Sequence, residues 1–337
     1  MNYDLVGIGN ALVDIEVQVE DSFIQEHGLV KGGMKLSTSA EQTLVLNALE
    51  GQAIKISSGG SAANTVHGIS VLGSSGYYLG RVANDNYGQH YSEDMKVCRV
   101  GFPGPNAETN GTGTCVVLVT PDSERTMLTH LGVSASLHPD NVDETIVRNA
   151  KMAYIEGYLW TGEETQKAAL KMAEIAKADG IPVAFTLSDA FVVNTFKKSL
   201  IDFIRWNVNI LFCNDVEALA MTDASNIESA FETLRGMADT VFMTLGAKGS
   251  WVSNNNMGKR EAVGVFPVTP VDTTGAGDLF AAGALHGILK GYSLKESAIL
   301  GSYCAAQVVT HMGPRMPLHA HTDAKKILDE YENIAPA

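Results

Sequence analysis

Positive charge is scarce in this sequence. Its 337 residues include 24 Lys and Arg against 38 Asp and Glu, which gives a formal net charge of -14 at pH 7. Because affinity for nucleic acid comes mostly from Lys and Arg side chains that neutralise phosphates, we expect no nucleic-acid partner. Any phosphate group that the protein handles must therefore be bound by a local arrangement of residues.

Long hydrophobic runs are lacking as well. No apolar stretch approaches the roughly 20 residues that a membrane-spanning helix requires. The opening MNYDLVGIGN has neither the basic region nor the apolar core of a signal peptide. We therefore expect a cytoplasmic protein that has no membrane partner.

Cysteine is also rare. The four cysteines lie far apart and lack the CxxC or Cys/His spacing that would indicate a zinc site. We expect buried, reduced thiols at Cys98, Cys115, Cys213 and Cys304.

Short apolar segments alternate with helical patterns along the whole chain. Residues 163–180 carry apolar side chains at three- and four-residue intervals and end on a glycine, which is typical of an amphipathic helix. Between such helices lie apolar segments with the length of buried strands: residues 3–9, 77–83, 153–159, 182–189, 209–215 and 240–246. This alternation predicts an α/β fold with a mainly parallel central sheet.

Other segments have the pattern of half-exposed strands. In LVDIEVQV, apolar residues alternate with polar ones, so Asp14 and Glu16 share a face that is expected to be solvated. TGTCVVLVT and RTMLTHL predict a hairpin around the turn-like PDSE. We expect a small second sheet with one exposed face, formed by insertions into a single domain that spans residues 1–337; these insertions cover approximately residues 12–20, 32–38, 51–58 and 111–131.

The segment VDTTGAGDLFAAG is the most unusual in the chain. Thr273 and Thr274 can cap a helix, and the glycines after them let the backbone approach a ligand closely. A helix that begins here directs its free N–H groups and its positive dipole end at an anion. Asp278, in the first turn, can accept the proton of a hydroxyl that attacks a phosphoryl group. Spacing alone supports equally well that Asp278 only stabilises the helix dipole and that Asp272 is an ordinary turn residue.

A second glycine-rich unit, SSGGSAANTVHGISVLG, places Gly59 and Gly60 before another helix. Ser61 and Asn64 fall at the start of that helix. A capping role is favoured for Ser61, whereas contact with a ligand is at least as well supported for Asn64. The paired glycines are equally compatible with a plain tight turn.

In NILFCNDVEALAM, a buried strand ends at Asn214, and Glu217 follows three residues later. An amide and a carboxylate on one helix face suit water-mediated Mg²⁺ binding. Asn214 as the helix cap and Glu217 as its partner explain the pair as well, and this structural interpretation is favoured. After the next strand, TLGAKGS either borders a nucleotide or forms a hairpin-like turn.

In this order, these pieces resemble the ribokinase (PfkB) family of carbohydrate and nucleoside kinases. DTTGAGDLFAAG is similar to the family's C-terminal signature, GGSAANTVHGISVLG to its N-terminal signature, and NDVEA to its Asn-x-x-Glu motif. The resemblance covers essentially the whole chain. It implies a three-layer α/β/α domain in which the small sheet forms a lid over the active site.

The resemblance also implies roles on the side of the phosphoryl donor. Asp278 would deprotonate the acceptor hydroxyl, and Gly275, Ala276 and Gly277 would form the anion hole for the transferred group. Asn214 and Glu217 would organise Mg²⁺, Glu217 through water, together with the phosphates of ATP. The further matches are Thr244, Gly246 and Gly249 beside ATP, and Asp272 and Thr274 at a site for a monovalent cation such as K⁺.

On the acceptor side, the resemblance reverses the expectation for Asp14, which would now face the ligand, whereas Glu16 is still expected at the surface. Sugar hydroxyls would be held by Asn10, Asp14, Gly59, Gly60 and Asn64. The segments GNALVDI, KGGMKLSTSAEQ and AYIEGYLW look more like adenosine-kinase-type members than like ribokinase or fructokinase. Candidate walls for a nucleobase are Met34, Leu36, Leu131 and Tyr158, although core packing is favoured for Leu36 and Leu131.

We therefore interpret the sequence as that of an ATP- and Mg²⁺-dependent kinase. Its acceptor would be the primary 5′-hydroxyl of a ribose-containing molecule, in the first place a purine nucleoside such as adenosine. The alternatives are a kinase of free ribose, fructose or a related sugar, and a non-catalytic nucleoside or sugar sensor, which the intact Asp278 disfavours. A monomer and a homodimer are both compatible with the sequence.

Overall fold

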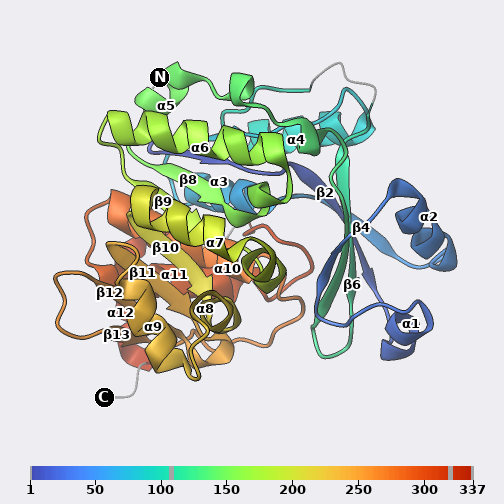
Figure 1. Cartoon of the computed structure of the whole chain (residues 1–337). Helices are drawn as coiled ribbons and strands as arrows, with labels where there is room; N and C mark the ends of the chain where they lie inside the picture. Colours follow the sequence, from blue (N-terminus) through green and yellow to red (C-terminus); the bar gives the residue numbers. More distant parts are fainter. Residues whose placement is uncertain (1, 106–109, 318–321, 335–337) are drawn as a thin grey trace.

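The computed structural model describes residues 2–105, 110–317 and 322–334. An eight-stranded sheet forms its centre, and a five-stranded sheet projects from one end (Figure 1). Within the described ranges, no helix is both long enough and apolar enough to cross a membrane. Three of the four free cysteines are buried and Cys98 is half-buried.

The large sheet confirms the mainly parallel arrangement expected from the sequence. Its order is β13-β12-β11-β10-β9-β8-β1-β5. The six parallel strands overlap the six predicted segments; they are β1 (Leu5–Ile8), β5 (Gly76–Leu79), β8 (Ala153–Glu156), β9 (Val183–Thr186), β10 (Ile210–Asn214) and β11 (Thr240–Thr244). An antiparallel edge that the sequence pattern did not predict is formed by β12 (Ser250–Asn254) and β13 (Glu261–Val263).

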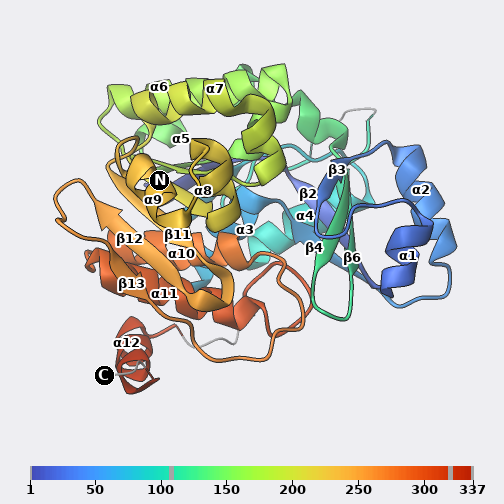
Figure 2. The ribbon, with the colours of Figure 1, turned by 60° about the horizontal axis from the view of Figure 1, so that its bottom comes forward.

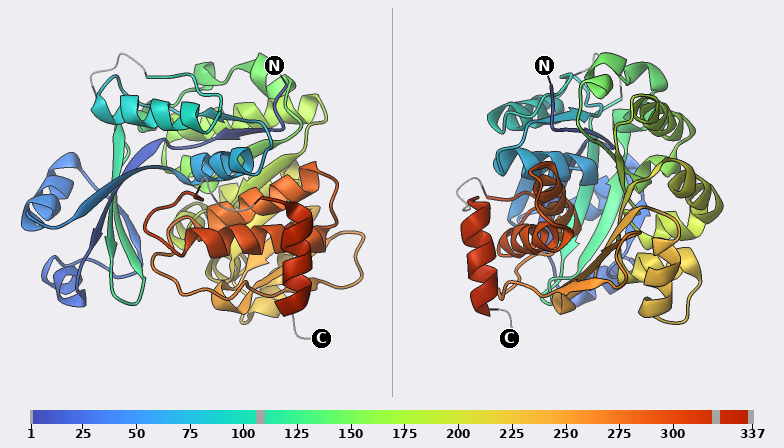
Figure 3. Two further views of the ribbon diagram at one scale, coloured as in Figure 1. Left: turned by 180° about the vertical axis from the view of Figure 1, so that it is seen from behind. Right: turned by 90° about the vertical axis from the view of Figure 1, so that its left-hand side faces the viewer.

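Helices cover both faces of this sheet, which confirms the three-layer arrangement (Figures 1 and 3). One face carries α5 (Glu144–Arg148), α6 (Glu163–Ala178), α7 (Ala190–Asn207), α8 (Asp215–Thr222) and α9 (Ile227–Arg235). The other carries α3 (Ser61–Val71), α4 (Asn86–Val97), α10 (Ala276–Leu289), α11 (Leu294–Val308) and α12 (Ala324–Ile334). Because successive strand residues alternate sides, Val6 and Ile8 enter the first core and Leu5 the second.

The small sheet has the order β3-β7-β6-β2-β4. Its strands are β2 (Leu12–Gln18), β3 (Met34–Leu36), β4 (Ile54–Gly59), β6 (Gly113–Val119) and β7 (Arg125–His130), of which β6 and β7 form the predicted hairpin. One face packs its apolar residues, such as Ile15 and Val17, against α1 (Asp21–Glu26) and α2 (Ser39–Ala48). The opposite face lies toward the carboxyl ends of the large sheet's strands (Figure 2).

Glu16 is buried, so the expectation that it lies at the surface is wrong. Its strand, β2, is an inner strand of the small sheet, and the segment around Gly313 covers its polar face. Only 1% of Glu16 is exposed; Ser57 Oγ donates to its Oε1 at 2.8 Å, and Lys55 Nζ lies 4.0 Å from its Oε2. Strand alternation alone did not reveal this cover, because it comes from a segment nearly 300 residues away in sequence.

Candidate active site

A cleft of 1010 Å³ lies between the carboxyl ends of the parallel strands and the inner face of the small sheet. This edge is where open α/β sheets bind ligands, because loops and helix N-termini converge there. Gly59 and Asp272 are the two predicted site residues outside its lining, and both lie directly behind it. The cleft brings together the others: Asn10, Asp14, Met34, Gly60, Asn64, Leu131, Tyr158, Asn214, Glu217, Thr244, Gly246, Gly249, Thr274, Gly275, Ala276, Gly277 and Asp278.

Helix α10 begins at Ala276 and opens on this cleft. Its N-cap is Gly275, with a φ of 77°, so the expectation of a threonine cap is wrong. A Cβ at this position would overlap the carbonyl oxygen of Pro314, and both facts require glycine. Thr274 instead donates its N–H and its hydroxyl to Asp272 Oδ1, at 2.8 and 2.5 Å. Ala276 N donates to the Thr273 carbonyl at 3.2 Å, and Gly275 and Gly277 are the further residues at this helix start that line the cleft, as in an anion site.

Asp278 occupies the first turn of α10 and is held from helix α3. Ser61 Oγ donates to its Oδ1 at 2.7 Å, and Asn64 Nδ2 donates to its Oδ2 at 2.9 Å. Ser61 is thus not the cap of α3, a position that Gly60 occupies. Burial raises the pKa of Asp278, while the bonds from Asn64 and Ser61 oppose the rise. A carboxylate fixed in this way can accept a proton from a hydroxyl in the cleft.

Asp14 lies on the inner face of β2, against Gly59, where an added Cβ would overlap the carboxylate. Only 6% of the residue is exposed, and within the described ranges no hydrogen bond reaches its side chain. Burial and the nearby Glu16 raise its pKa well above the usual value. A buried carboxylate without donors is costly unless a ligand supplies them, so its hydroxyl-binding assignment has a physical basis.

The structure confirms the capping interpretation of Asn214 and Glu217, and their binding of Mg²⁺ stays a prediction. They form a full capping box at the start of α8, with Glu217 N donating to Asn214 Oδ1 at 2.8 Å and Asn214 N donating to Glu217 Oε2 at 3.0 Å. The same two side chains line the cleft. Burial raises the pKa of Glu217 to about 7, with the Asn214 N–H opposing and Asp189 and Asp278 adding to the rise.

The turn after β11 also lines this end of the cleft. Gly246 and Gly249 have φ values of 56° and 93°, and a Cβ at Gly249 would overlap the Val263 carbonyl. Thr244 ends the strand beside them. The glycines are therefore required by the turn itself, whatever it borders.

The candidate walls for a base face the cleft. Leu36 is 38% exposed and lines the cleft, so the expectation of core packing is wrong for this residue. Leu131 also lines the cleft and is half-buried. Met34 and Tyr158 complete this set. Residue alternation in β3 accounts for Met34 and Leu36 on one face.

Two residues of the site were missed at the level of sequence. Arg125, on β7, is the one Lys or Arg among the described residues that line the cleft, and its charge favours ionisation of Asp278 and Asp189. Glu156 is fully buried and accepts from the N–H groups of Asn10 at 2.7 Å and Ala62 at 2.8 Å. Burial raises the pKa of Glu156 to about 7, against these two bonds. The alternation in RTMLTHL, which puts Arg125 and Met127 on one face, was the available signal for the arginine.

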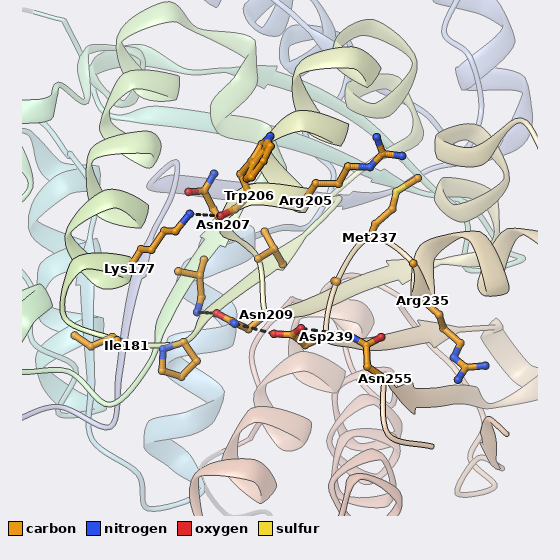
Figure 4. Close-up of a pocket in the computed structure, with 16 residues that line it drawn as sticks. Lys177, Ile181, Arg205, Trp206, Asn207, Asn209, Arg235, Met237, Asp239 and Asn255 are labelled. Atoms are coloured by element: carbon orange, nitrogen blue, oxygen red, sulfur yellow. Dashed lines mark hydrogen bonds between the residues drawn. The ribbon is translucent and has the colours of Figure 1, made fainter. Parts of the chain in front are cut away.

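A second hollow, of 520 Å³, lies at the opposite, amino ends of β9, β10 and β11 (Figure 4). Two pairs of its polar groups bond to each other: Lys177 Nζ donates to the Trp206 carbonyl at 2.7 Å, and Asn209 Nδ2 donates to Asp239 Oδ2 at 2.9 Å. It has no helix N-terminus with a carboxylate beside it among the described residues. The chemistry therefore lies in the cleft at the carboxyl ends.

A helix N-terminus for an anion, with a carboxylate placed to take a proton from a hydroxyl, is what phosphoryl transfer to an alcohol requires. The comparisons with known proteins agree. The model described as pfkB family carbohydrate kinase matches residues 37–321, and the chain belongs to this family. It is a phosphotransferase with a hydroxyl acceptor, on the ribokinase-like fold.

Three similar proteins within this class are named as kinases of adenosine or of a sugar. Adenosine kinase from Saccharomyces cerevisiae is 28% identical, over 94% of this chain and 98% of its own length. The crystal structure of adenosine kinase from Sinorhizobium meliloti is 35% identical with a TM-score of 0.91, over 99% of this chain and all of the other. A probable sugar kinase protein from Rhizobium etli is 32% identical with a TM-score of 0.92, over the same shares.

Proposed function

We propose that this protein phosphorylates the 5′-hydroxyl of a purine nucleoside, with adenosine as the first candidate, at the expense of Mg-ATP. The observation that carries the proposal is the composition of the acceptor half of the cleft. Asp14 and Asn64 present polar groups near Asp278, and the apolar side chains of Met34, Leu36 and Leu131 lie beside them. A free sugar has hydroxyls that can bond to the polar side chains, but it has no base to lie against the apolar ones. Two of the three relatives described above are named adenosine kinases.

The mechanism follows from the charges in the cleft. Asp278 takes the proton of the acceptor hydroxyl as that oxygen attacks the γ-phosphorus of ATP, and the bond from this phosphorus to the bridging oxygen of the β-phosphate breaks, so that ADP leaves. Negative charge on the transferred group is met by the N–H groups at Gly275 and Gly277 and by the guanidinium of Arg125; the N–H of Ala276, which donates to the Thr273 carbonyl at 3.2 Å, would have to be shared with it. Glu217, through water, and the ATP phosphates would hold Mg²⁺, which would offset negative charge on those phosphates; no three His, Cys, Asp or Glu side chains are grouped as a metal site among the described residues.

The small sheet acts as the lid of this site. It carries Asp14 for the acceptor and Arg125 for the phosphoryl group, so its closure would complete both halves together and exclude water, the competing acceptor. The loop of Asp272 and Thr274, which the pair's own hydrogen bonds hold, would contact a monovalent cation such as K⁺. The lid boundaries and this cation site remain predictions from the sequence resemblance.

An acceptor panel tests the proposal. With Mg-ATP, we expect kcat/KM for adenosine to exceed that for inosine, guanosine and cytidine, and to exceed that for ribose and fructose by the largest factor, with phosphate at the 5′ position by NMR. Preference for ribose or fructose would replace the proposal by the free-sugar kinase, which the likeness to a probable sugar kinase favours. Binding of a nucleoside without turnover of any acceptor would support the sensor.

A further inference from the structure

Arg315 is buried in a way that stability does not explain. Its side chain is 12% exposed, and its Nη1 lies 3.7 Å from Asp94 Oδ2, longer than a hydrogen bond. The guanidinium carbon lies 5.6 Å from the ring centre of Tyr91. Its Nε and Nη2 are buried without a hydrogen-bond partner. Burying a cation with so few partners costs free energy, so a function for this charge is expected.

Both neighbours of Arg315 hold the strand that borders the acceptor pocket. Asp94 Oδ2 accepts a hydrogen bond from Ser58 Oγ at 2.5 Å, and the Tyr91 hydroxyl donates to the Gly59 carbonyl at 3.0 Å. Ser58 and Gly59 end β4, directly before Gly60 at the start of α3. A shift of Arg315 would therefore be transmitted to Gly59, which lies against the Asp14 carboxylate.

The chain next to Arg315 holds the anion hole. Gly313 N donates to Asp272 Oδ2 at 2.9 Å, and Pro314 lies so close to Gly275 that no Cβ fits between them. Residues 313–315 thus contact the loop before α10 at one end and the acceptor strand, through Asp94 and Tyr91, at the other. This segment joins the two halves of the cleft.

Arg315 also supplies the positive charge near Asp14. The titratable and charged groups that face Asp14 are Glu16 on its own strand, Cys115 on β6, Tyr91 on α4, Asp272, Asp278 and Arg315. Burial first and Glu16 second raise the pKa of Asp14, Asp278 and Asp272 add to the rise, and Arg315 lowers it. An ionised carboxylate accepts hydrogen bonds from sugar hydroxyls more strongly than a neutral acid does.

We propose that Arg315 is a positioning residue for acceptor binding: its guanidinium, between Asp94 and Tyr91, fastens the segment behind the anion hole to the acceptor strand. The proposal rests on the assignment of Asp14 to the acceptor. It concerns a residue that touches neither substrate, because Arg315 is absent from the lining of the cleft.

The test compares R315Q, which removes the charge, with R315K, which keeps it. In ligand-free protein, NMR titration of the Asp14 carboxyl, assigned with D14N, should show a midpoint about one pH unit higher in R315Q and a smaller shift in R315K. In turnover, R315Q should raise the KM of the best acceptor about tenfold and that of Mg-ATP less than about twofold, with R315K between R315Q and the wild type. R235Q is the matched control, since Arg235 is 18% exposed, has a buried Nε without a partner and lies at the opposite hollow.

The outcomes separate the two proposals. An unchanged Asp14 midpoint in R315Q overturns the role of Arg315, whatever the acceptor is. So does an R315K variant that is no better than R315Q, because packing alone would then explain the effect. If the wild type phosphorylates none of the acceptors, the proposed function fails, and the titration still decides for or against Arg315. Should R315Q fail to fold, D94N, which removes the guanidinium's partner, is expected to raise acceptor KM by a smaller factor, and an unchanged KM there contradicts the proposal.

Discussion

The two hollows at opposite ends of the same parallel strands differ in how their charges are balanced. At the amino ends, Asp239 and Lys177 are exposed and each bonds to a group of the protein. At the carboxyl ends, burial raises the pKa values of Asp14, Glu217 and Asp278, and Arg125 is the one arginine among the described residues that line the cleft. Like charges in a shared low-dielectric space are costly. The molecule retains that cost at one end only, which is the end where substrates can bring the compensating groups.

The strongest test of this difference between the two ends is to neutralise one aspartate at each end. We expect D278N to lose roughly two to four orders of magnitude in kcat, because the proton acceptor is gone, while both substrates still bind. Turnover under saturating Mg-ATP and acceptor measures this, and calorimetry with each ligand measures binding. The same substitution at Asp239 is the control. A kcat of D278N near that of the wild type would remove Asp278 from the mechanism.

The next largest effect is expected at Arg125, the cation on the lid side of the cleft. R125Q should lower kcat by about a hundredfold, with a smaller change in acceptor KM, since the guanidinium would act mainly on charge that grows in the transition state. Single-turnover quench-flow measures the chemical step directly. R81Q, an arginine outside the cleft lining, serves as the control. If R125Q changes only the KM for Mg-ATP, Arg125 binds the ground state and not the transferred phosphoryl group.

A substitution of Asp14 is expected to weaken binding of the acceptor and to leave binding of ATP nearly unchanged. We expect D14A to raise the acceptor Kd by roughly 10- to 100-fold, because a charge-assisted hydrogen bond to a sugar hydroxyl is lost. The Kd for ATP should stay within about twofold of the wild-type value. Titration calorimetry with each ligand gives both constants. Equal losses for the two ligands would show that Asp14 supports the cleft as a whole.

Much of the architecture was predictable because its signals are local. The six parallel strands have continuous apolar segments, and α6 has a clear helical period that ends at Ala178, two residues before the expected stop at Gly180. The antiparallel edge was not predicted, since β12 is half-polar and β13 has three residues. Local pattern also failed for Glu16, whose cover is supplied by the distant segment around Gly313.

The residues of the candidate site also differ in how well the sequence predicted them, according to whether their signals are local. Gly275, Asp278 and the pair of Asn214 and Glu217 stand in compact motifs, so spacing made them candidates and the family resemblance of those motifs gave them roles. Arg125 and Glu156 were missed, because each acquires its surroundings from elements far apart in the chain. Ser61 was assigned to the wrong partner for a related reason: a hydroxyl at a helix start suits a cap, and its bond to Asp278 exists only once α3 and α10 are packed together.

A smaller effect, set by pH, is expected at Glu217. Because burial raises the pKa of Glu217 to about 7, its carboxyl is ionised above that pH and protonated below it. Between pH 8 and pH 6 the ionised fraction falls about tenfold, and the KM for Mg-ATP should rise accordingly. Initial rates at saturating acceptor measure the profile. ATP itself also ionises in this range, so E217Q is the reference. This variant should retain the pH dependence of the KM that is due to ATP and lose the pH dependence that is due to Glu217. Parallel profiles for the two proteins would contradict the metal-organising role.

The smallest effect is expected at the amino-end hollow. D239A removes the acceptor of hydrogen bonds from Asn209 at 2.9 Å and Asn255 at 3.3 Å. Both bonds are exposed, so water can replace them, and the melting temperature should fall by roughly 2 °C or less. Values of kcat and both KM should stay within about twofold of the wild type, because none of the described residues at this hollow lines the cleft. A large loss of turnover without a loss of stability would mean that the two ends of the strands are coupled, and the comparison on which these predictions stand would have to be abandoned.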